Sequence, residues 1–368
     1  MGQGMKILFL ITGLGGGGAE KVVIDLADEM FKKGHQVKIA YLKGEVIVRP
    51  KNKEIELVYL GLESFSNIFQ CFKNYKKIIE SYQPDVVHSH MVHANIFARI
   101  SRNFIKMKRL ICSAHSNNEG GRLRMLAYRL THQLSEITTN VSIDAALNFE
   151  KLNAVPKGKI LTIYNGIDLT RFDKRDANES LRSELGLDIH TRIFLAVGRF
   201  HDAKDYPNLL NAFAIFKATN FFKENNSKLI IAGDGELRDE VESLIRKLGI
   251  QSEVILLGRR EDIPVLLNSV DYFVLSSKYE GLPTVVIEAM ACEVFVISTD
   301  CGGSKEIMGA TGMLVPVQNS PVLAAAFAKV VTLKNSEIIM NNKIARKRVE
   351  EQFSLNSSVS NWLKIYES

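Results

Sequence analysis

The sequence lacks several features that would assign it to common protein classes. No apolar run is long enough to span a bilayer, and no small-residue cleavage site follows the first apolar segment, so no secretory signal is expected. The 4 cysteines are scattered, without a C-x-x-C pair or histidines at zinc spacing. We therefore expect free thiols in a reducing cytosol. Asp-x-Asp, a pair that can hold a divalent ion against a diphosphate, is also absent.

The chain of 368 residues is long enough for two domains with full-sized cores. Its charge is uneven: residues 1–165 carry 23 Lys/Arg and 14 Asp/Glu, a net of +9, and the remainder carries −3. Residues 66–129 hold 11 basic and 3 acidic side chains. This stretch is either a solvated face or a contact for anionic lipid. Nucleic-acid binding is disfavoured because no aromatic–basic interleaving or known module accompanies the charge.

Apolar runs alternate with amphipathic segments in both halves of the chain, which predicts an α/β protein with two doubly wound parallel sheets. Strands are expected at 5–11, 36–42, 56–60, 85–88, 109–114 and 137–141, within 159–168, and at 193–197, 228–232, 254–257, 272–275 and 294–298. Helices are expected at 19–33, 68–82, 94–104, 124–134 and from 143, and at 207–217, 237–248, 263–268 and 284–291.

The pattern weakens and restarts once, which predicts the domain limits. We expect a first domain over residues 1–165 and a linker over 166–190 with one short helix at 178–185. A second domain is expected over residues 191–342, and the tail, 343–368, is expected to be helical and contains the lone Trp362.

The stretch from Ser276 to Cys292 joins a strand exit to a helix start. Pro283 suits the first residue of a helix from Thr284 to Ala291, whose unpaired N–H groups and positive dipole end would attract an anion such as a diphosphate. Glu280 and Glu288 bracket that site and could accept hydrogen bonds from hydroxyl groups on either side of the anion. The alternative is a surface-loop glutamate and an ordinary helix-face glutamate.

A glycine loop, Gly13 to Gly18, formally satisfies G-x-G-x-x-G after the first strand. The acidic residue expected at the end of the second strand is missing, since that strand ends Tyr41-Leu42-Lys43, which disfavours a dinucleotide and hydride chemistry. We favour a loop that lets a phosphate or sugar approach the backbone closely, with a permissive turn as the alternative.

Basic side chains follow strands of the second half. Arg199, Lys204, Gly233 to Gly235, Arg259 and the 276–284 stretch should lie on one rim, because the carboxyl ends of parallel strands share an edge. Arg199 and Lys204 could flank a diphosphate; alternatively they are solvated surface cations.

Three histidines, His88, His90 and His115, are each expected to follow a strand of the first half. His115 could donate to a substrate hydroxyl or phosphate, or shuttle a proton. A metal site built from the three is conceivable but disfavoured, since no carboxylate stands at ligand spacing.

Together these features resemble the retaining GT-B glycosyltransferases of family 4. The resemblance rests on Ala19-Glu20 after the glycine loop, Gly34-His35, Asn165-Gly166-Ile167-Asp168, Gly198-Arg199 with Lys204, and Glu280 followed by Glu288 in EGLPTVVIE. It runs over nearly the whole chain, and the spacing of the two glutamates is its most specific part. It implies two domains facing across a cleft, with the acceptor on the side of residues 1–165 and the nucleotide sugar on the other.

The resemblance also implies roles for individual residues. Arg199 and Lys204 would bind the donor diphosphate, Glu288 would hold the ribose hydroxyls, and Glu280 and His115 would lie beside the donor sugar. Glu280, His115, Arg199 and Lys204 would thus carry the catalysis. The rest of the donor site would comprise Gly15, Gly16, Gly17, Gly18, Gly233, Gly258, Arg259, Arg260, Gly281, Leu282, Pro283 and Thr284. One departure is Asp205-Tyr206 after Lys204, where many members have a glycine.

The function implied is transfer of a sugar, with retention, from a nucleotide-diphosphate sugar, above all a UDP-sugar, to a glycan or polyprenyl-linked acceptor of bacterial surface polysaccharide. The phosphate leaving group would take the acceptor proton, and the domains would close about the linker. No cofactor or metal is expected. In such proteins the C-terminal helix often crosses back to the first domain, and the expected location is cytoplasmic, with a possible peripheral contact to the inner face of the membrane. A UDP-sugar epimerase of the same architecture and a non-catalytic nucleotide-binding protein are the rival hypotheses.

Overall fold

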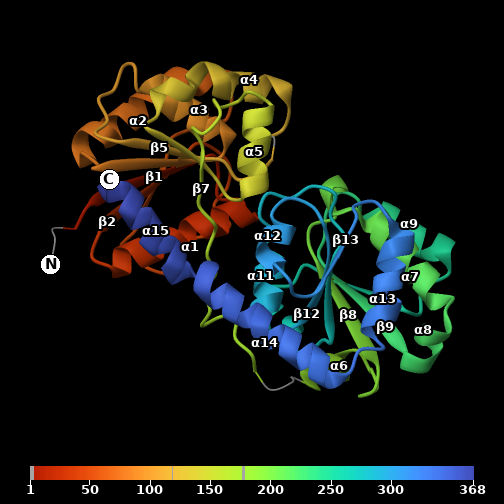
Figure 1. Ribbon diagram of the computed structural model, residues 1–368. Coiled ribbons are helices and arrows are strands. Elements are labelled where there is room, and N and C mark those ends of the chain that lie inside the picture. Colours follow the sequence, from red (N-terminus) through yellow and green to blue (C-terminus); the bar gives the residue numbers. More distant parts are fainter. Residues whose placement is uncertain (1–3, 118, 176–178) are drawn as a thin grey trace. The chain divides into compact units, whose positions relative to one another are not determined.

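The computed structural model describes residues 4–117, 119–175 and 179–368, and the chain divides into two compact units. The first comprises Met1–Gly166 with Ser354–Ser368, and the second comprises Ile167–Phe353. Each unit is built on one parallel sheet covered by helices (Figure 1). The predicted fold class, two doubly wound α/β domains, is confirmed.

The first unit carries the longer sheet. Its strands, in sheet order, are β3 (Glu56–Tyr59), β2 (Gln36–Tyr41), β1 (Lys6–Ile11), β4 (Val86–His90), β5 (Leu110–Ser113), β6 (Ile137–Asn140) and β7 (Leu161–Thr162). Its helices are α1 (Gly18–Lys32), η1 (Phe65–Asn67), α2 (Ile68–Tyr82), α3 (Val92–Ser101), α4 (Arg122–Thr131), η2 (His132–Leu134), α5 (Ile143–Lys151) and α15 (Leu355–Glu367).

The second unit repeats the arrangement. Its strands, in sheet order, are β10 (Val254–Gly258), β9 (Ser227–Ala232), β8 (Arg192–Val197), β11 (Tyr272–Leu275), β12 (Phe295–Thr299) and β13 (Met313–Val315). Its helices are α6 (Glu179–Glu184), η3 (Asp202–Lys204), α7 (Tyr206–Lys217), α8 (Asn220–Asn225), α9 (Arg238–Leu248), α10 (Ile263–Leu267), α11 (Thr284–Ala291), α12 (Ser304–Met308), α13 (Ser320–Val330) and α14 (Asn335–Gln352).

The central strand β1 shows why its sequence is apolar at every position. Leu8 and Leu10 enter a core with α2 and α3, whereas Ile7, Phe9 and Ile11 enter a second core with α1 and α15. Both faces of the strand are therefore buried, as in a doubly wound sheet. In the second unit, the core on one face contains Phe194 of β8 together with aromatic side chains of α7 and α13.

Strand order reverses direction once in each sheet, between β1 and β4 in the first and between β8 and β11 in the second. At such a switch point the two neighbouring loops diverge to opposite faces of the sheet and leave a crevice at the strand ends, where ligands of open α/β sheets bind. The loops that follow β8 and β11 are the ones singled out in the sequence.

The structure differs from expectation mainly at the C-terminal end. A helix was expected from residue 343, but α14 begins at Asn335 and stays with the second unit, and only α15 belongs to the first unit. The helices α8, α12 and α13 and the strand β13 were not anticipated. The linker helix at 178–185 corresponds to α6, and residue 178 lies outside the described residues.

Candidate functional site

The candidate donor site of the second unit lies at its switch point. After β8 the chain turns through Gly198 into η3, which ends at Lys204, and after β11 it runs through residues 276–283 into α11. Asp205 takes a left-handed conformation, with φ 49°, and its side chain accepts from the Asn208 backbone N–H to begin α7. An aspartate thus occupies a left-handed backbone geometry that glycine would favour, at the position where the resemblance leads us to expect a glycine.

Lys204 and Glu280 are brought into direct contact across that switch point. The Lys204 Nζ lies 2.7 Å from Glu280 Oε1, and the Ser277 hydroxyl donates to the same oxygen at 2.7 Å. The Lys204 and Glu280 side chains are only 22% and 16% exposed, so the pair is more than a solvated surface contact. An ammonium group with three N–H donors can hold this carboxylate and a phosphate oxygen together.

Close backbone approaches hold these two residues in place. A Cβ at Gly198 would lie 2.9 Å from Lys204 Cε, so the missing side chain leaves room for the lysine stem. Gly302, with φ +50°, crosses the other loop so closely that a Cβ there would lie 2.3 Å from the Glu280 carbonyl oxygen. The Gly303 N–H donates to the Gly281 carbonyl at 2.8 Å.

Helix α11 begins at Thr284, so Pro283, which was expected to suit the first helical position, is the N-cap residue instead. No side-chain hydrogen bond caps this end, and the Val286 N–H donates to the Pro283 carbonyl at 3.0 Å, so Thr284 and Val285 are the residues whose N–H groups could meet an anion. Leu282 and Pro283 are buried, and Glu288 lies partly buried one turn further along the helix. The predicted limits of the helix, 284–291, are confirmed.

The remaining predicted donor contacts of this unit lie along the same edge of the sheet. Gly233 donates its N–H to the Gly258 carbonyl at 2.8 Å, joining the exits of β9 and β10. Arg199 is exposed and lies 3.4 Å from Glu236, while Arg259 is exposed. Arg260 is directed to Asp262 and Glu184, at 2.7 and 2.8 Å, so it braces the unit internally.

The glycine loop of the first unit follows β1 and ends at α1, for which Gly17 is the N-cap residue. A Cβ added at Gly15 or Gly18 would meet nothing within 4 Å. The fold itself therefore does not require glycine at these two positions, and the space above them stays open. Gly16 has φ +89°, a conformation that does require it.

The histidines correct the sequence interpretation in one respect: His88 and His90 lie within β4 instead of following it. His88 is fully buried, and its two nitrogens bond to Tyr366 Oη at 2.6 Å and Ser113 Oγ at 2.7 Å. His88 therefore ties α15 to the sheet. Its neighbour His90 is also buried and pairs through Nδ1 with His115 Nε2 at 3.0 Å.

His115 does follow β5 as expected, but its ring faces inward. Burial lowers its pKa to about 4, so the imidazole is neutral near pH 7. Its Nε2 is hydrogen-bonded to His90, and its Nδ1 is buried and has no hydrogen-bond partner among the described residues. In this rotamer neither nitrogen is presented to a sugar.

Three residues of the site received no individual role from the sequence, although Ser277 lies within the 276–284 stretch. Ser277 orients Glu280 through its hydroxyl, Thr299 donates to the Ser277 carbonyl at 2.6 Å, and Gly302 lets its loop pass beneath Glu280. The available signal was the Gly302-Gly303 pair, which lies shortly after the end of a buried strand at Thr299, at the same sheet edge as the residues already chosen.

Among the described residues, no group of three or more His, Cys, Asp or Glu side chains is placed to hold a metal ion. Within the same residues, every helix is too short or too polar to traverse a bilayer.

Comparison with known proteins assigns the chain to a family. The model of the family "Glycosyl transferases group 1" matches residues 177–348, and that of "Glycosyltransferase Family 4" matches residues 16–171. Two relatives are N-acetyl-alpha-D-glucosaminyl L-malate synthase of Bacillus anthracis and an alpha-1,4-N-acetyl-D-galactosaminyltransferase of Campylobacter jejuni whose name specifies a diphosphoundecaprenol-linked acceptor. The first is 32% identical over 63% of this chain and 59% of its own length, and the second is 28% identical over 98% of each.

Among solved structures, HepE of Anabaena in complex with UDP superposes with a TM-score of 0.84 at 20% identity, covering 99% of this chain and 100% of that one. This likeness extends over both units and supports the GT-B fold. The two family models together span nearly the whole described chain and meet in the linker region. The chain therefore belongs to the group 1 glycosyltransferases of the GT-B fold and is a transferase.

Proposed function

We propose that this glycosyltransferase moves a sugar, with retention of anomeric configuration, from a UDP-sugar to a hydroxyl group of a lipid-linked glycan in bacterial surface polysaccharide synthesis. The observation that carries the proposal is the Lys204–Glu280 contact of 2.7 Å at the switch point of the second unit, beside the uncapped start of α11. A cation and a helix N-terminus can hold the diphosphate of a nucleotide sugar, and a carboxylate can accept hydrogen bonds from its hydroxyl groups.

On this proposal, the diphosphate of the donor lies at the start of α11 with Lys204 and Arg199 as its counter-charges. The ammonium group and the guanidinium group stabilise the negative charge that grows on the phosphate as the glycosidic bond breaks. Because both cations belong to the chain, we propose that transfer needs no divalent ion. Glu288 accepts hydrogen bonds from the ribose hydroxyls, and Glu280 accepts one from the sugar.

Retention follows when the acceptor hydroxyl attacks the face from which the UDP departs. The departing phosphate oxygen takes the acceptor proton, so no side chain has to act as general base. The neutral state of His115, whose pKa burial lowers to about 4, agrees with a role as a hydrogen-bond partner and not as a charged acid. This role requires its ring to turn from the inward orientation.

The proposed acceptor rests on the relatives. The Campylobacter jejuni relative is named for a diphosphoundecaprenol-linked substrate, and an Escherichia coli relative is named for UDP-Gal and a diphosphoundecaprenol acceptor. An acceptor of this kind lies in a membrane, so we propose that the protein works in the cytoplasm at the inner face of that membrane. The basic stretch of the first unit, with 11 Lys/Arg against 3 Asp/Glu over residues 66–129, suits an anionic surface.

A panel of nucleotide sugars, offered with and without a lipid extract, tests the function through released UDP or GDP. We expect release that depends on both a UDP-sugar and the extract, and that persists in EDTA. Loss of turnover on chelation would contradict the metal-independent mechanism, while nucleotide binding without release from any donor would favour a non-catalytic protein. Conversion of the donor to a sugar epimer would instead favour the epimerase alternative.

A further inference from the structure

A pocket of about 870 Å³ opens in the first unit between α2, α3 and α4. Its wall is largely apolar, with Phe69 and Phe72 from α2, Ile96 and Phe97 from α3, and Leu123 from α4. Phe69 is 79% exposed and Leu123 is 83% exposed. Single exposed apolar side chains are ordinary, but a concave cluster of them marks a binding surface.

One end of this pocket is positively charged. Lys43 follows β2, and His93 and Arg124 lie in the first turns of α3 and α4, so all three line the pocket at the strand-exit edge of the sheet. The glycine loop after β1 lies at this same edge. Burial lowers the pKa of His93, and the charges of Arg124 and Lys43 lower it further. As lining residues, Lys43 and Arg124 place two cations at the polar end of the pocket.

Among the described lining residues, one carboxylate shares that end of the pocket. Glu63 lies in the lining, but it accepts hydrogen bonds from Tyr59 Oη at 2.6 Å and from the Gly44 N–H at 3.0 Å. These bonds hold its pKa below the usual value. Arg124 donates to the Glu119 carbonyl at 2.9 Å, which anchors its guanidinium while leaving further N–H donors for an anion.

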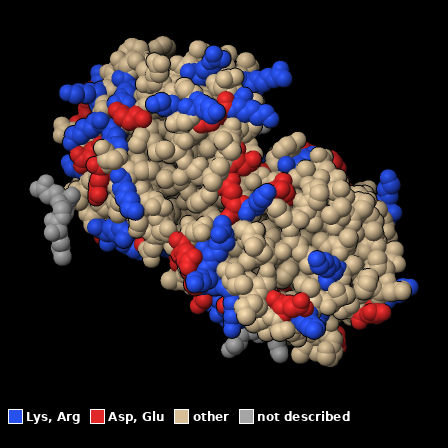
Figure 2. Space-filling model, in the orientation of Figure 1, with Lys and Arg blue, Asp and Glu red and all other residues tan. Residues whose placement is uncertain are grey.

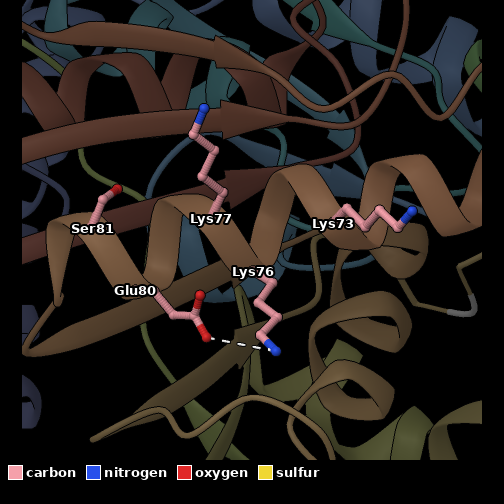
Figure 3. A pocket seen from close by; sticks show the side chains of 5 residues that line it. All are labelled: Lys73, Lys76, Lys77, Glu80 and Ser81. Carbon is pink, nitrogen blue, oxygen red and sulfur yellow. Dashed lines mark ion pairs between the residues drawn. The ribbon is translucent and has the colours of Figure 1, made fainter.

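Helix α2 adds cations beside the apolar wall. Lys73, Lys76 and Lys77 project from it in different directions around a shallow depression, and only Lys76 among them is drawn paired, with Glu80 at 3.7 Å (Figure 3). Figure 2 shows that blue lysine and arginine side chains are numerous over the face of the first unit in view. The aromatic residues and the lysines of α2 thus form a surface suited to a molecule that is both apolar and anionic.

We propose that this pocket binds the hydrocarbon chain of a lipid phosphate, with its phosphate between Lys43 and Arg124, and that the acceptor of the transferase is such a lipid. The inference rests on the proposed function, which it deepens by naming the substrate's chemistry and its binding site. The concave shape favours a single chain over a flat bilayer surface, and the cations at one end set its direction. Neither a bare hydrocarbon nor a free phosphate would use both parts of the pocket.

Calorimetry on the full chain tests this with farnesyl phosphate, farnesol and inorganic phosphate as probes, each below its aggregation concentration. We expect farnesyl phosphate to bind at least about tenfold more tightly than either other probe, since a tenfold ratio needs only one good charge-assisted contact. Ile96→Trp, which fills the pocket, should weaken the binding of farnesyl phosphate by a similar factor. Phe69→Ser, which removes an exposed part of the pocket wall without touching the core, should have the same effect. Leu147→Trp, at an exposed position on α5 outside the lining, is the control.

The double variant Lys43→Ala/Arg124→Ala should reduce the affinity for farnesyl phosphate to that for farnesol and leave the affinity for farnesol unchanged. Equal binding of farnesyl phosphate to the wild type, to Ile96→Trp and to Phe69→Ser would overturn the proposal. Binding to anionic vesicles alone, unaffected by Phe69→Ser, would also overturn it and would identify a bilayer-docking face. UDP affinity, measured on every variant, separates the two proposals: intact UDP binding without lipid binding rejects the pocket and spares the donor site.

Discussion

At the scale of single residues, the Lys204–Glu280 pair combines two roles that are hard to separate. Each partner is mostly buried, so removing one leaves the other as a poorly solvated charge, a change that costs stability as well as function. A matched pair exists in the same unit: Lys217 and Glu253 also lie 2.7 Å apart and are 33% and 14% exposed. Lys217 ends α7 and Glu253 precedes β10, at the opposite edge of the sheet.

Lys204→Ala should therefore lower transfer by about 100-fold or more, the usual effect of removing one group that stabilises transition-state charge. Arg199→Ala should act in the same direction with less loss of stability, because that side chain is exposed. Initial rates and thermal unfolding of each variant are the measurements.

Lys217→Ala is the control, with a comparable drop in stability and near-normal rates. If Lys204→Ala and Arg199→Ala both keep more than about a tenth of wild-type activity, the diphosphate role is wrong.

Glu288→Ala tests the ribose contact. The carboxylate lies one turn inside α11, where it would accept from ribose hydroxyls, so we expect UDP to bind roughly tenfold more weakly, the effect of one lost hydrogen bond to a charged group. Titration calorimetry with UDP measures this directly. An unchanged dissociation constant would mean that Glu288 is an ordinary helix-face residue.

At the scale of elements, α11 is held in place by α14. The Arg346 guanidinium donates to the Ala291 carbonyl at 2.6 Å, at the end of α11, and to the Phe172 carbonyl at 2.8 Å. It also meets Asp173 and Glu350 at 3.4 and 2.7 Å. A cation at a helix C-terminus satisfies open carbonyls and complements the dipole, so Arg346 fixes the helix whose other end forms the candidate donor site.

Arg346→Ala should lower the free energy of unfolding of the second unit by about 2 kcal/mol, since it removes several hydrogen bonds made by a charged group. Urea unfolding followed by circular dichroism measures this effect. Lys347→Ala, at the neighbouring position, where the side chain is 76% exposed, should change the free energy of unfolding little. Equal effects of the two substitutions would show that Arg346 does not brace α11.

The elements also show how far sequence alone could reach. The helices 68–82 and 284–291 and the strand 272–275 were predicted to the residue, because each has a clear apolar period and a helix-start or loop signal. By contrast, α12 and β13 are 5 and 3 residues long, too short for a period to show. The Lys204–Glu280 contact joins residues far apart in the chain, and only the strand order places them together. Pairing of His90 with His115 depends on side-chain rotamers, which no spacing rule supplies.

At the scale of the whole molecule, the buried histidines make stability depend on pH. Burial lowers the pKa of His88 and His90 well below the ordinary value and that of His115 to about 4. An unfolded chain binds protons at these histidines near pH 6.5 while the folded chain does not, so stability falls as the pH drops from about 6.5 towards 4. Burial raises the pKa of Glu119, which on its own would make the folded state more stable on acidification. We expect the three histidines together to outweigh this single carboxyl group.

The first unit should therefore unfold at lower urea at pH 5.5 than at pH 7.5. Its single tryptophan, Trp362, is buried 4.3 Å from the His88 ring, so fluorescence reports this unit. His90→Gln should flatten the pH dependence, and His190→Gln, at an exposed position, should not. A midpoint that stays constant or rises on acidification would refute the assignment of these histidines as neutral and buried.

We propose, for the reaction as a whole, that this transferase passes a sugar from a UDP-sugar to a lipid-linked acceptor with retention. The most direct measurement is the anomeric configuration of the product formed from an α-linked UDP-sugar, read from the proton coupling at the new glycosidic carbon. We expect an α-linked product, formed with release of one UDP per sugar transferred. A β-linked product, or no transfer to a lipid-linked acceptor from any UDP-sugar, would contradict it.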